Sequence, residues 1–375
     1  MVAGGKYFLY EQVFLTLKDE ILQGLYDRGS CLPSEREIAQ RFHVDRATVR
    51  KAMDLLVGES LVEKRAGSCS KVLYQGKDTG LLQKHAGTMI GFFIIEDSGT
   101  NRIITQPFYS DLFYEVEQQC KRYGMDVLYA TIKSMKEYAS LLQQLSYVII
   151  AGKSSPEYFR LAEKHQVRAL HVHGYNGVSP SITYDSFNSG ILMSEYLITH
   201  GHHDIALITG RSNFPTSQNR LAGVLLTMFR HQLSISPEWI LEGNWEYESG
   251  YQMATKLFRS VGKHPTAIYA FNDIMALGAM QAIKDLGLSI PADVSIVGGD
   301  NIRELESSGV KLTTTNANIN RMAVSAIQLF LHTPEDAGGL QIMVPVSLIE
   351  GDTVRNLRYR PMQRIYHTPS SHHSK

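Results

Sequence analysis

The amino-acid sequence predicts an α/β protein in which an N-terminal winged helix-turn-helix precedes a two-lobed domain of parallel sheets flanked by helices. Two observations carry this prediction. Residues 1–75 read as short helices followed by a small ribbon, whereas the sequence from residue 89 onward alternates apolar strands with helices. The chain of 375 residues is also long enough for two or three domains with sizeable cores.

The N-terminal elements follow from local signals. A first helix carries apolar residues spaced by four, namely Val13, Leu17 and Ile21. Ser34 and Glu37 have the spacing of a capping box, which opens a second helix that ends near residue 42. Asp45 is the expected N-cap of a third helix. Residues 61–65 and 69–74 then pair as the two strands of a wing.

Basic residues gather on the second and third helices. Residues 36–51 hold five basic residues against two acids, inside a chain whose 37 Lys and Arg equal its 37 Asp and Glu. Arg46 and Arg50, one turn apart, can reach guanine or phosphate in a major groove, and Thr48 can touch a base edge. The alternative is a solvated basic helix face. The expected phosphate contacts are Arg36 on the second helix and Lys64, Arg65 and Lys71 on the wing.

The stretch LPSEREIAQRFHVDRATVRKAMDLLVGESLVEKRAG resembles the GntR family of winged-helix regulators nearly throughout. The resemblance implies DNA contacts by Arg36, Arg46, Thr48 and Arg50 and by the wing at Gly67. The wing departs from the family pattern, because residues 67–71 read GSCSK where the family commonly has G-x-G-T-F.

Residues 76–88 are glycine-containing and aperiodic, so we expect a linker there. The predicted domains are the winged helix at 1–75, an effector-binding and dimerisation domain at 89–357, and a basic, disordered tail at 358–375. The strand–helix pattern of the large domain is too long for one ordinary doubly wound sheet. We therefore expect two similar lobes with a ligand at their junction, beyond the carboxyl ends of the strands.

Polar and aromatic residues follow several of these predicted strands. Carboxylates and a guanidinium suit the hydroxyl groups of a polyol, while aromatic rings cover its C–H surface. The alternative assigns the aspartates to helix caps and the aromatic residues to packing. The candidate effector-binding residues are Phe108, Tyr109, His173, Asp185, Arg220, Trp245, Asn272, Asp273 and Asp300.

The large domain also resembles the LacI/GalR effector domain, a periplasmic-binding-protein-like sensor, over roughly residues 89–355. The most specific segment is HPTAIYAFNDIMALGAMQAIKDLGLSIPADVSIVGGDNI. The resemblance implies effector contacts by Arg220, Asn272, Asp273, Asp300 and the aromatic loop at residues 108–109. Two departures concern the pocket: His173 stands where aspartate is common, and Gly299 stands in place of an aromatic residue.

A GntR-type winged helix joined to a LacI-type sensor resembles the arabinose-repressor subgroup. That resemblance implies a sugar-responsive bacterial repressor, acting as a homodimer on double-stranded operator DNA and released by a monosaccharide such as L-arabinose or L-fucose. A purine or phosphorylated sugar as effector, or an effector-dependent activator, is the alternative. Residues 74–88 lack the short minor-groove helix of LacI proteins.

Other classes of protein are disfavoured. The chain contains no H-E-x-x-H, G-x-S-x-G, Walker-type or G-x-G-x-x-G motif, so no enzyme is indicated. Its apolar runs are far shorter than the roughly 20 residues of a spanning helix, and no signal-peptide layout is present. We expect a cytoplasmic protein without membrane contact.

Cysteine and histidine usage predicts neither disulfides nor metal. The three cysteines, at positions 31, 69 and 120, are odd in number and form no C-x-x-C pair, so we expect no disulfide framework and no cysteine zinc site. Histidines at 171 and 173, at 200, 202 and 203, and at 372 and 373 leave a metal sensor as a weaker alternative. We expect no cofactor and no bound metal.

Overall fold

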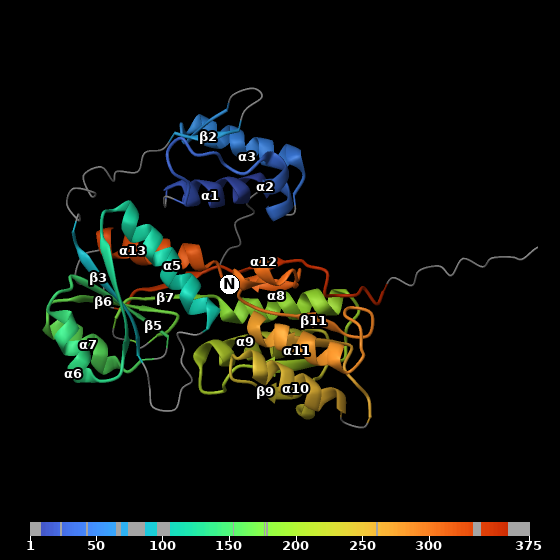
Figure 1. Cartoon of the computed structure of the whole chain (residues 1–375). Helices are drawn as coiled ribbons and strands as arrows, with labels where there is room; N and C mark the ends of the chain where they lie inside the picture. Colours follow the sequence, from blue (N-terminus) through green and yellow to red (C-terminus); the bar gives the residue numbers. More distant parts are fainter. Residues whose placement is uncertain are drawn as a thin grey trace, which may run out of the picture. The chain divides into compact units, whose positions relative to one another are not determined.

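A computed structural model describes most of the chain (Figure 1). The described residues are 9–22, 25–42, 44–64, 69–73, 87–95, 106–152, 154–175, 177, 179–259, 262–332 and 339–358. They fall into two compact units, one of residues 1–185 with 317–345 and the other of residues 186–316 with 346–375. The predicted linker at 76–88, apart from its last two residues, and the predicted tail, apart from residue 358, lie outside the described residues.

The N-terminal part of the first unit is the predicted winged helix-turn-helix. Its elements are α1 (Leu9–Leu22), α2 (Glu35–Phe42), α3 (Arg46–Gly58), β1 (Val62–Glu63) and β2 (Lys71–Val72). Val13, Leu17 and Ile21 are buried in one core with apolar residues of α2 and α3, which confirms the predicted stripe. Both wing strands are shorter than predicted, two residues each.

Both predicted helix caps are present. The backbone N–H of Glu37 donates to the Ser34 hydroxyl at 3.3 Å, and the Glu37 carboxylate accepts from the Ser34 backbone N–H at 2.7 Å. Asp45 accepts from the backbone N–H of Thr48 at 2.7 Å, and this bond lowers the pKa of the Asp45 carboxyl. These bonds fix where α2 and α3 begin.

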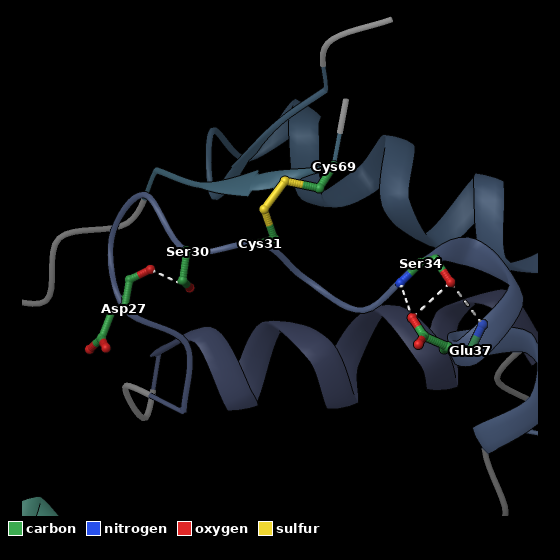
Figure 2. Close-up of a disulfide and its surroundings, with 6 residues drawn as sticks. All are labelled: Asp27, Ser30, Cys31, Ser34, Glu37 and Cys69. Atoms are coloured by element: carbon green, nitrogen blue, oxygen red, sulfur yellow. Dashed lines mark hydrogen bonds between the residues drawn. A yellow bond between two sulfur atoms is a disulfide. The ribbon is translucent and has the colours of Figure 1, made fainter. Parts of the chain in front are cut away.

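The expectation of no disulfide is wrong. Cys31 is bonded to Cys69, with a Cα–Cα distance of 5.6 Å (Figure 2). The cause is strand register: residues 29–32 lie beside β2, and Cys31 bridges to Lys71 in antiparallel fashion. Spacing along the sequence does not reveal this register, because the two cysteines are 38 positions apart. The third cysteine, Cys120, is buried and free.

The rest of the first unit is a six-stranded, all-parallel sheet in the order β13-β7-β6-β5-β3-β4. Its strands are β3 (Met89–Ile95), β4 (Asp126–Ile132), β5 (Tyr147–Ala151), β6 (Arg168–Val172), β7 (Ser181–Tyr184) and β13 (Gln341–Val344). Its helices are α5 (Pro107–Arg122), α6 (Met135–Leu142), α7 (Pro156–Lys164) and α13 (Ile319–His332). The apolar runs of β3 and β5 are buried apart from their first residues, whereas β4, at the edge of the sheet, is mostly half-buried.

The second unit has a four-stranded parallel sheet in the order β11-β10-β8-β9. The strands are β8 (Ile205–Thr209), β9 (Ile240–Glu242), β10 (Ala267–Ala270) and β11 (Ser295–Val297). The helices are α8 (Ser186–Thr199), α9 (Pro215–Arg230), η2 (Pro237–Trp239), α10 (Tyr247–Arg259), α11 (Asp273–Asp285) and α12 (Glu304–Ser308). A separate antiparallel pair joins β12 (Thr314–Asn316) to β14 (Ser347–Ile349).

Two glycines allow α8 and α9 to pack closely. A Cβ atom on Gly190 would lie 2.2 Å from the carbonyl oxygen of Arg220, and one on Gly223 would lie 2.1 Å from that of Phe187. Close packing at these points fixes the position of Arg220, which therefore enters the unit from α9 as a buried side chain. Within the described part of the chain, no helix is both long enough and apolar enough to cross a membrane.

Candidate functional site

The first candidate surface is the exposed face of α3. Arg46 and Arg50 are exposed and Thr48 is half-buried, whereas Val49 and Met53 pack into the core. The N-cap at Asp45 sets the start of the helix, so the two arginines project from its first two turns. The arginines are therefore open to solvent, and the reading of DNA by this face stays a prediction.

Arg50 is held by an acid from the neighbouring helix. Its Nε donates to the Glu35 carboxylate at 3.0 Å. Lys64, on the wing, lies 2.8 Å from the Asp54 carboxylate and 3.9 Å from that of Glu35. Because these groups are at least partly exposed, the ion pairs are weak and a phosphate or base can replace the carboxylates. Sequence reasoning did not single out Glu35 or Asp54.

The remaining predicted DNA contacts are distributed over α2 and the wing. Arg36 and Lys71 are exposed. Arg65 and Gly67 lie outside the described residues. Arg41, the other arginine of α2, is exposed, but its guanidinium donates to the buried Glu20 carboxylate at 3.0 Å, so it is held in an ion pair within the domain.

An aromatic cluster lies in the first unit. Phe108 and Tyr109 begin α5, His173 follows β6, and Tyr184 ends β7. The Tyr109 hydroxyl is 2.9 Å from Nδ1 of His173, and the His173 ring lies 4.4 Å from that of Phe108 and 5.3 Å from that of Tyr184. The structure thus brings together three of the predicted residues, Phe108, Tyr109 and His173. The cluster's fourth member, Tyr184, was not predicted, although its place at a strand end was a usable signal.

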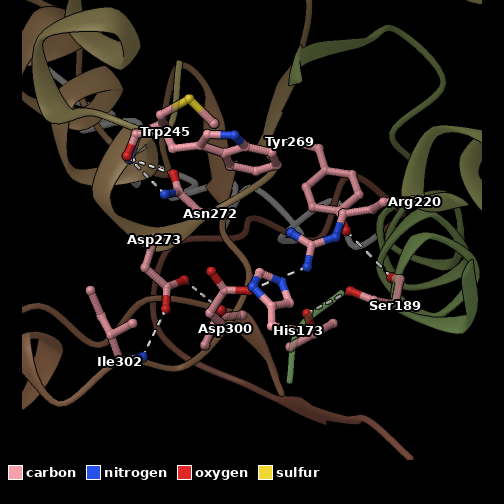
Figure 3. A network of polar contacts seen from close by, with 12 residues as sticks. His173, Ser189, Arg220, Trp245, Tyr269, Asn272, Asp273, Asp300 and Ile302 are labelled. Atoms are coloured by element: carbon pink, nitrogen blue, oxygen red, sulfur yellow. Dashed lines mark hydrogen bonds and ion pairs between the residues drawn. The ribbon is translucent and has the colours of Figure 1, made fainter. Parts of the chain in front are cut away.

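A buried charge pair lies in the second unit (Figure 3). Arg220 is 2% exposed and Asp300 8% exposed, and an Nη of Arg220 donates to the Asp300 carboxylate at 3.2 Å. The guanidinium also lies over the Phe271 ring, 5.8 Å from its centre. Asp300 has a φ of 105° and its backbone N–H donates to Thr315, which anchors the loop after β11 to β12.

Gly299 is required by the position of Arg220. A Cβ atom on Gly299 would lie 2.6 Å from Nη1 of Arg220 and 3.0 Å from the carbonyl oxygen of Phe271. The guanidinium therefore occupies the volume that an aromatic side chain would need at position 299.

The side chains of Asn272 and Asp273 form hydrogen bonds with other protein groups. Asn272 caps α11 by accepting from Met275, and its Nδ2 donates to the carbonyl of Trp245 at 3.0 Å. Asp273 is fully buried and accepts from the Thr314 hydroxyl at 2.6 Å and from the Ile302 backbone at 3.0 Å. Burial, and next the charge of Asp300, raises the pKa of Asp273 to about 8.

Trp245 and Asp185 differ in setting. Trp245 has a φ of 74° and packs beside Gly210, where a Cβ atom would lie 1.8 Å from the indole ring. Its ring is also 6.3 Å from that of Phe214. Asp185 is half-buried just before α8, and its backbone N–H donates to Val344.

Two of the histidines considered for metal binding, His171 and His202, are buried and hydrogen-bonded to other protein groups. His202 is buried, with its ring nitrogens within 3.1 Å of Thr266, Ser295 and the carbonyl of Arg355, and burial lowers its pKa to about 4. His171 is buried with Nε2 2.6 Å from the Gly152 carbonyl. Within the described ranges, no group of three or more His, Cys, Asp or Glu side chains could hold a metal ion.

Comparisons with known proteins match both parts of the chain. Residues 9–72 match the family of bacterial regulatory proteins, gntR family, and residues 194–354 match the periplasmic binding protein-like domain. The HTH-type transcriptional repressor PurR of Histophilus somni (strain 129Pt) is 31% identical over 242 residues, which are 62% of this chain and 72% of that protein. PurR of Actinobacillus pleuropneumoniae serotype 3 is 40% identical over 153 residues, 41% of this chain and 45% of that protein.

Solved structures of LacI-type regulators are also similar to this chain. The lac repressor dimer bound to operator and the anti-inducer ONPF is 25% identical, with a TM-score of 0.60 over 75% of this chain and 99% of that one. A LacI transcriptional regulator from a Rhodococcus species is 24% identical, with a TM-score of 0.62 over 72% of this chain and 98% of that one. The relatives are transcription regulators and not enzymes, and the chain belongs to the bacterial transcriptional regulators in which a GntR-type helix-turn-helix domain is joined to a LacI/GalR-type, periplasmic-binding-protein-like sensor domain.

Proposed function

We propose that the chain is a repressor that releases its operator when the sensor domain binds a neutral monosaccharide, L-arabinose or L-fucose being the leading candidates. The observation that carries the choice of a polyol is the buried pair of Arg220 and Asp300. A sugar hydroxyl donates to a carboxylate and accepts from a guanidinium, so one such pair can bind two neighbouring hydroxyl groups. The resemblance to the arabinose-repressor subgroup narrows the choice of sugar to these two candidates.

The aromatic residues support a ligand with one apolar face. Phe108, Tyr109 and Tyr184 surround His173 in the first unit, and Trp245 lies near Phe214 in the second. We propose that both clusters contribute to effector binding, since ring faces stack on the C–H surface of a sugar. We also propose Asp185 as a polar contact to the effector.

The direct and indirect contacts are separated by geometry. Arg220 and Asp300 are the proposed direct polar contacts. The side-chain oxygen of Asn272 accepts a hydrogen bond from Met275, and its amide nitrogen donates one to Trp245. The Asp273 side chain accepts hydrogen bonds from Thr314 and Ile302. We therefore propose that Asn272 positions Trp245 and that Asp273 positions Asp300.

A purine is the second candidate effector. The relatives are named PurR, and the aromatic cluster of the first unit can stack on a planar base. Calorimetry with a panel of L-arabinose, L-fucose, D-galactose, hypoxanthine, guanine and a phosphorylated sugar separates the candidates. A ligand at a hundred times its Kd also stabilises the protein by about 2.7 kcal/mol, which a thermal-shift assay detects. Binding of a purine or phosphorylated sugar without binding of a sugar contradicts the proposal.

On the DNA side, we propose that Arg46, Thr48 and Arg50 read bases. The proposed phosphate contacts are Arg36, Lys64, Arg65 and Lys71, with the wing approaching DNA at Gly67. One recognition helix reads only a few base pairs, so we propose a homodimer on a near-palindromic site. Sedimentation at micromolar concentration, with and without DNA, tests this, and a monomer in both conditions contradicts it.

A further inference from the structure

We propose that Cys31 and Cys69 form a reversible thiol–disulfide site that controls how firmly the wing is held for DNA binding. Cys31 lies just before the Pro33–Ser34 start of α2, and Cys69 lies two residues before Lys71 on β2. The bond thus joins the entry of the helix-turn-helix to the return strand of the wing (Figure 2). This inference does not depend on the identity of the effector.

Backbone hydrogen bonds bring the two cysteines together whether or not the sulfurs are bonded. The N–H of Gly29 donates to Val72 at 2.8 Å, that of Leu32 to Ser70 at 2.9 Å, and that of Val72 to Ser30 at 3.0 Å. The Cα–Cα distance of 5.6 Å lies inside the range of roughly 4.4 to 6.8 Å that disulfides need. Reduced thiols would therefore stay adjacent, which is the condition for reversible closure.

The pair is accessible, and the third cysteine is not. Cys31 is exposed and Cys69 is half-buried, so both ends of the bond lie at the surface of the domain. Cys120 is fully buried in α5, and burial raises its thiol pKa to about 12. A low-molecular-weight thiol or disulfide therefore exchanges with the Cys31–Cys69 pair rather than with Cys120.

The chemistry is thiol–disulfide exchange with a low-molecular-weight disulfide such as oxidised glutathione. One protein thiolate attacks the glutathione disulfide, which forms a mixed disulfide and releases one reduced glutathione. The second protein thiolate then displaces the other glutathione and completes the Cys31–Cys69 bond. Two protein thiols lose two protons and two electrons, and one glutathione disulfide becomes two thiols; the reverse reaction consumes two thiols.

Closure would act on DNA binding through restraint. The bond spans 38 positions, and the closed loop contains both helices of the helix-turn-helix and β1. A cross-link over such a loop restricts the unfolded chain and stabilises the domain. The backbone hydrogen bonds set the register of the wing strand that carries Lys71, and the cross-link limits how far this strand separates when those bonds open, so less order has to be gained on binding DNA. The oxidised form should be the tighter DNA binder.

The experiment uses the full chain equilibrated in glutathione buffers of graded redox ratio. Free thiols are trapped with N-ethylmaleimide and counted by mass spectrometry, while fluorescence anisotropy measures affinity for an operator selected from random DNA. We expect the disulfide form to bind the operator about threefold to tenfold more tightly than the dithiol form. Its DNA-binding domain should unfold about 10 °C higher.

Matched variants assign the effect. Cys31→Ser and Cys69→Ser should bind like the reduced protein at every redox ratio, and Cys120→Ala should retain the full response. The proposal is overturned if no Cys31–Cys69 bond forms in excess oxidised glutathione, or if the bond forms while operator affinity stays constant. The titration of the wild-type protein alone distinguishes these outcomes, so the test does not depend on the variants folding well.

Discussion

The carboxylate of Asp273 and the hydroxyl of Thr314 are joined by a buried hydrogen bond of 2.6 Å. The other carboxylate oxygen accepts from the backbone of Ile302 at 3.0 Å. Asp273 also donates from its own backbone N–H to Gly299. One buried residue therefore ties the loop that carries Asp300 to both α11 and β12.

The first prediction concerns pH. The pKa of Asp273 is raised from 3.8 to about 8, so the folded protein retains a proton that the unfolded chain loses. Stability from this group is fully present below pH 3.8 and falls as pH rises toward 8. In Asp273→Asn the amide donates to Thr314 and the carbonyl accepts from Ile302, without any titration. The Tm of the variant relative to wild type should therefore rise between pH 5 and 8. A constant difference in Tm across that range contradicts the burial argument.

The second prediction concerns Gly299. A Cβ atom there would press on Nη1 of Arg220 at 2.6 Å, and the backbone of Phe271 blocks relief on the other side. Gly299→Ala should displace the guanidinium and weaken effector binding about tenfold or more, the equivalent of roughly 1.4 kcal/mol. Operator binding without effector should be unchanged. Gly58→Ala is the matched control, because a Cβ there has no neighbour within 4 Å. Equal effector affinity in both variants would remove Arg220 from the site.

The third prediction separates specificity from charge on the DNA-binding domain. Arg50→Ala should cost about 1 to 3 kcal/mol on the selected operator and much less on random DNA, if Arg50 makes a bidentate base contact. Lys71→Ala should weaken both complexes alike and reduce the salt dependence by about one phosphate contact. Anisotropy titrations at several salt concentrations measure both effects. An equal loss on the two DNAs for Arg50→Ala would move Arg50 to the phosphate contacts.

The elements that the sequence predicted well are those with local signals. The Ser34–Glu37 box and the Asp45 cap lie within three residues of their partners, so the helix-turn-helix follows from spacing alone. The runs at β3, β5 and β8 are recognisable because nearly all of their residues are apolar and buried. Short or half-exposed strands such as β13 have no such pattern. β13 forms a strand because it pairs with β7, which is distant in the sequence.

The site residues show the same limit. A sequence places Asp273 and Asp300 after strands, but it does not show which carboxylate faces protein donors. That depends on Thr314, which reaches Asp273 from 41 positions away. The Cys31–Cys69 bond was mispredicted for the same reason, because only the register of residues 29–32 against β2 brings the sulfurs together.

The last prediction concerns Arg220 and Asp300. Asp300→Asn removes the carboxylate from a guanidinium that is only 2% exposed, and loss of one partner of a buried ion pair costs about 3 kcal/mol of stability. The double variant Arg220→Met with Asp300→Asn removes both charges, so it should recover much of that loss. Both variants should bind effector weakly and, once folded, should bind the operator as the effector-free wild type does. Thermal unfolding measures the recovery, and calorimetry measures effector binding. If the double variant regains stability together with effector binding, the pair serves only the fold; if stability returns while effector binding stays lost, recognition belongs to these two residues.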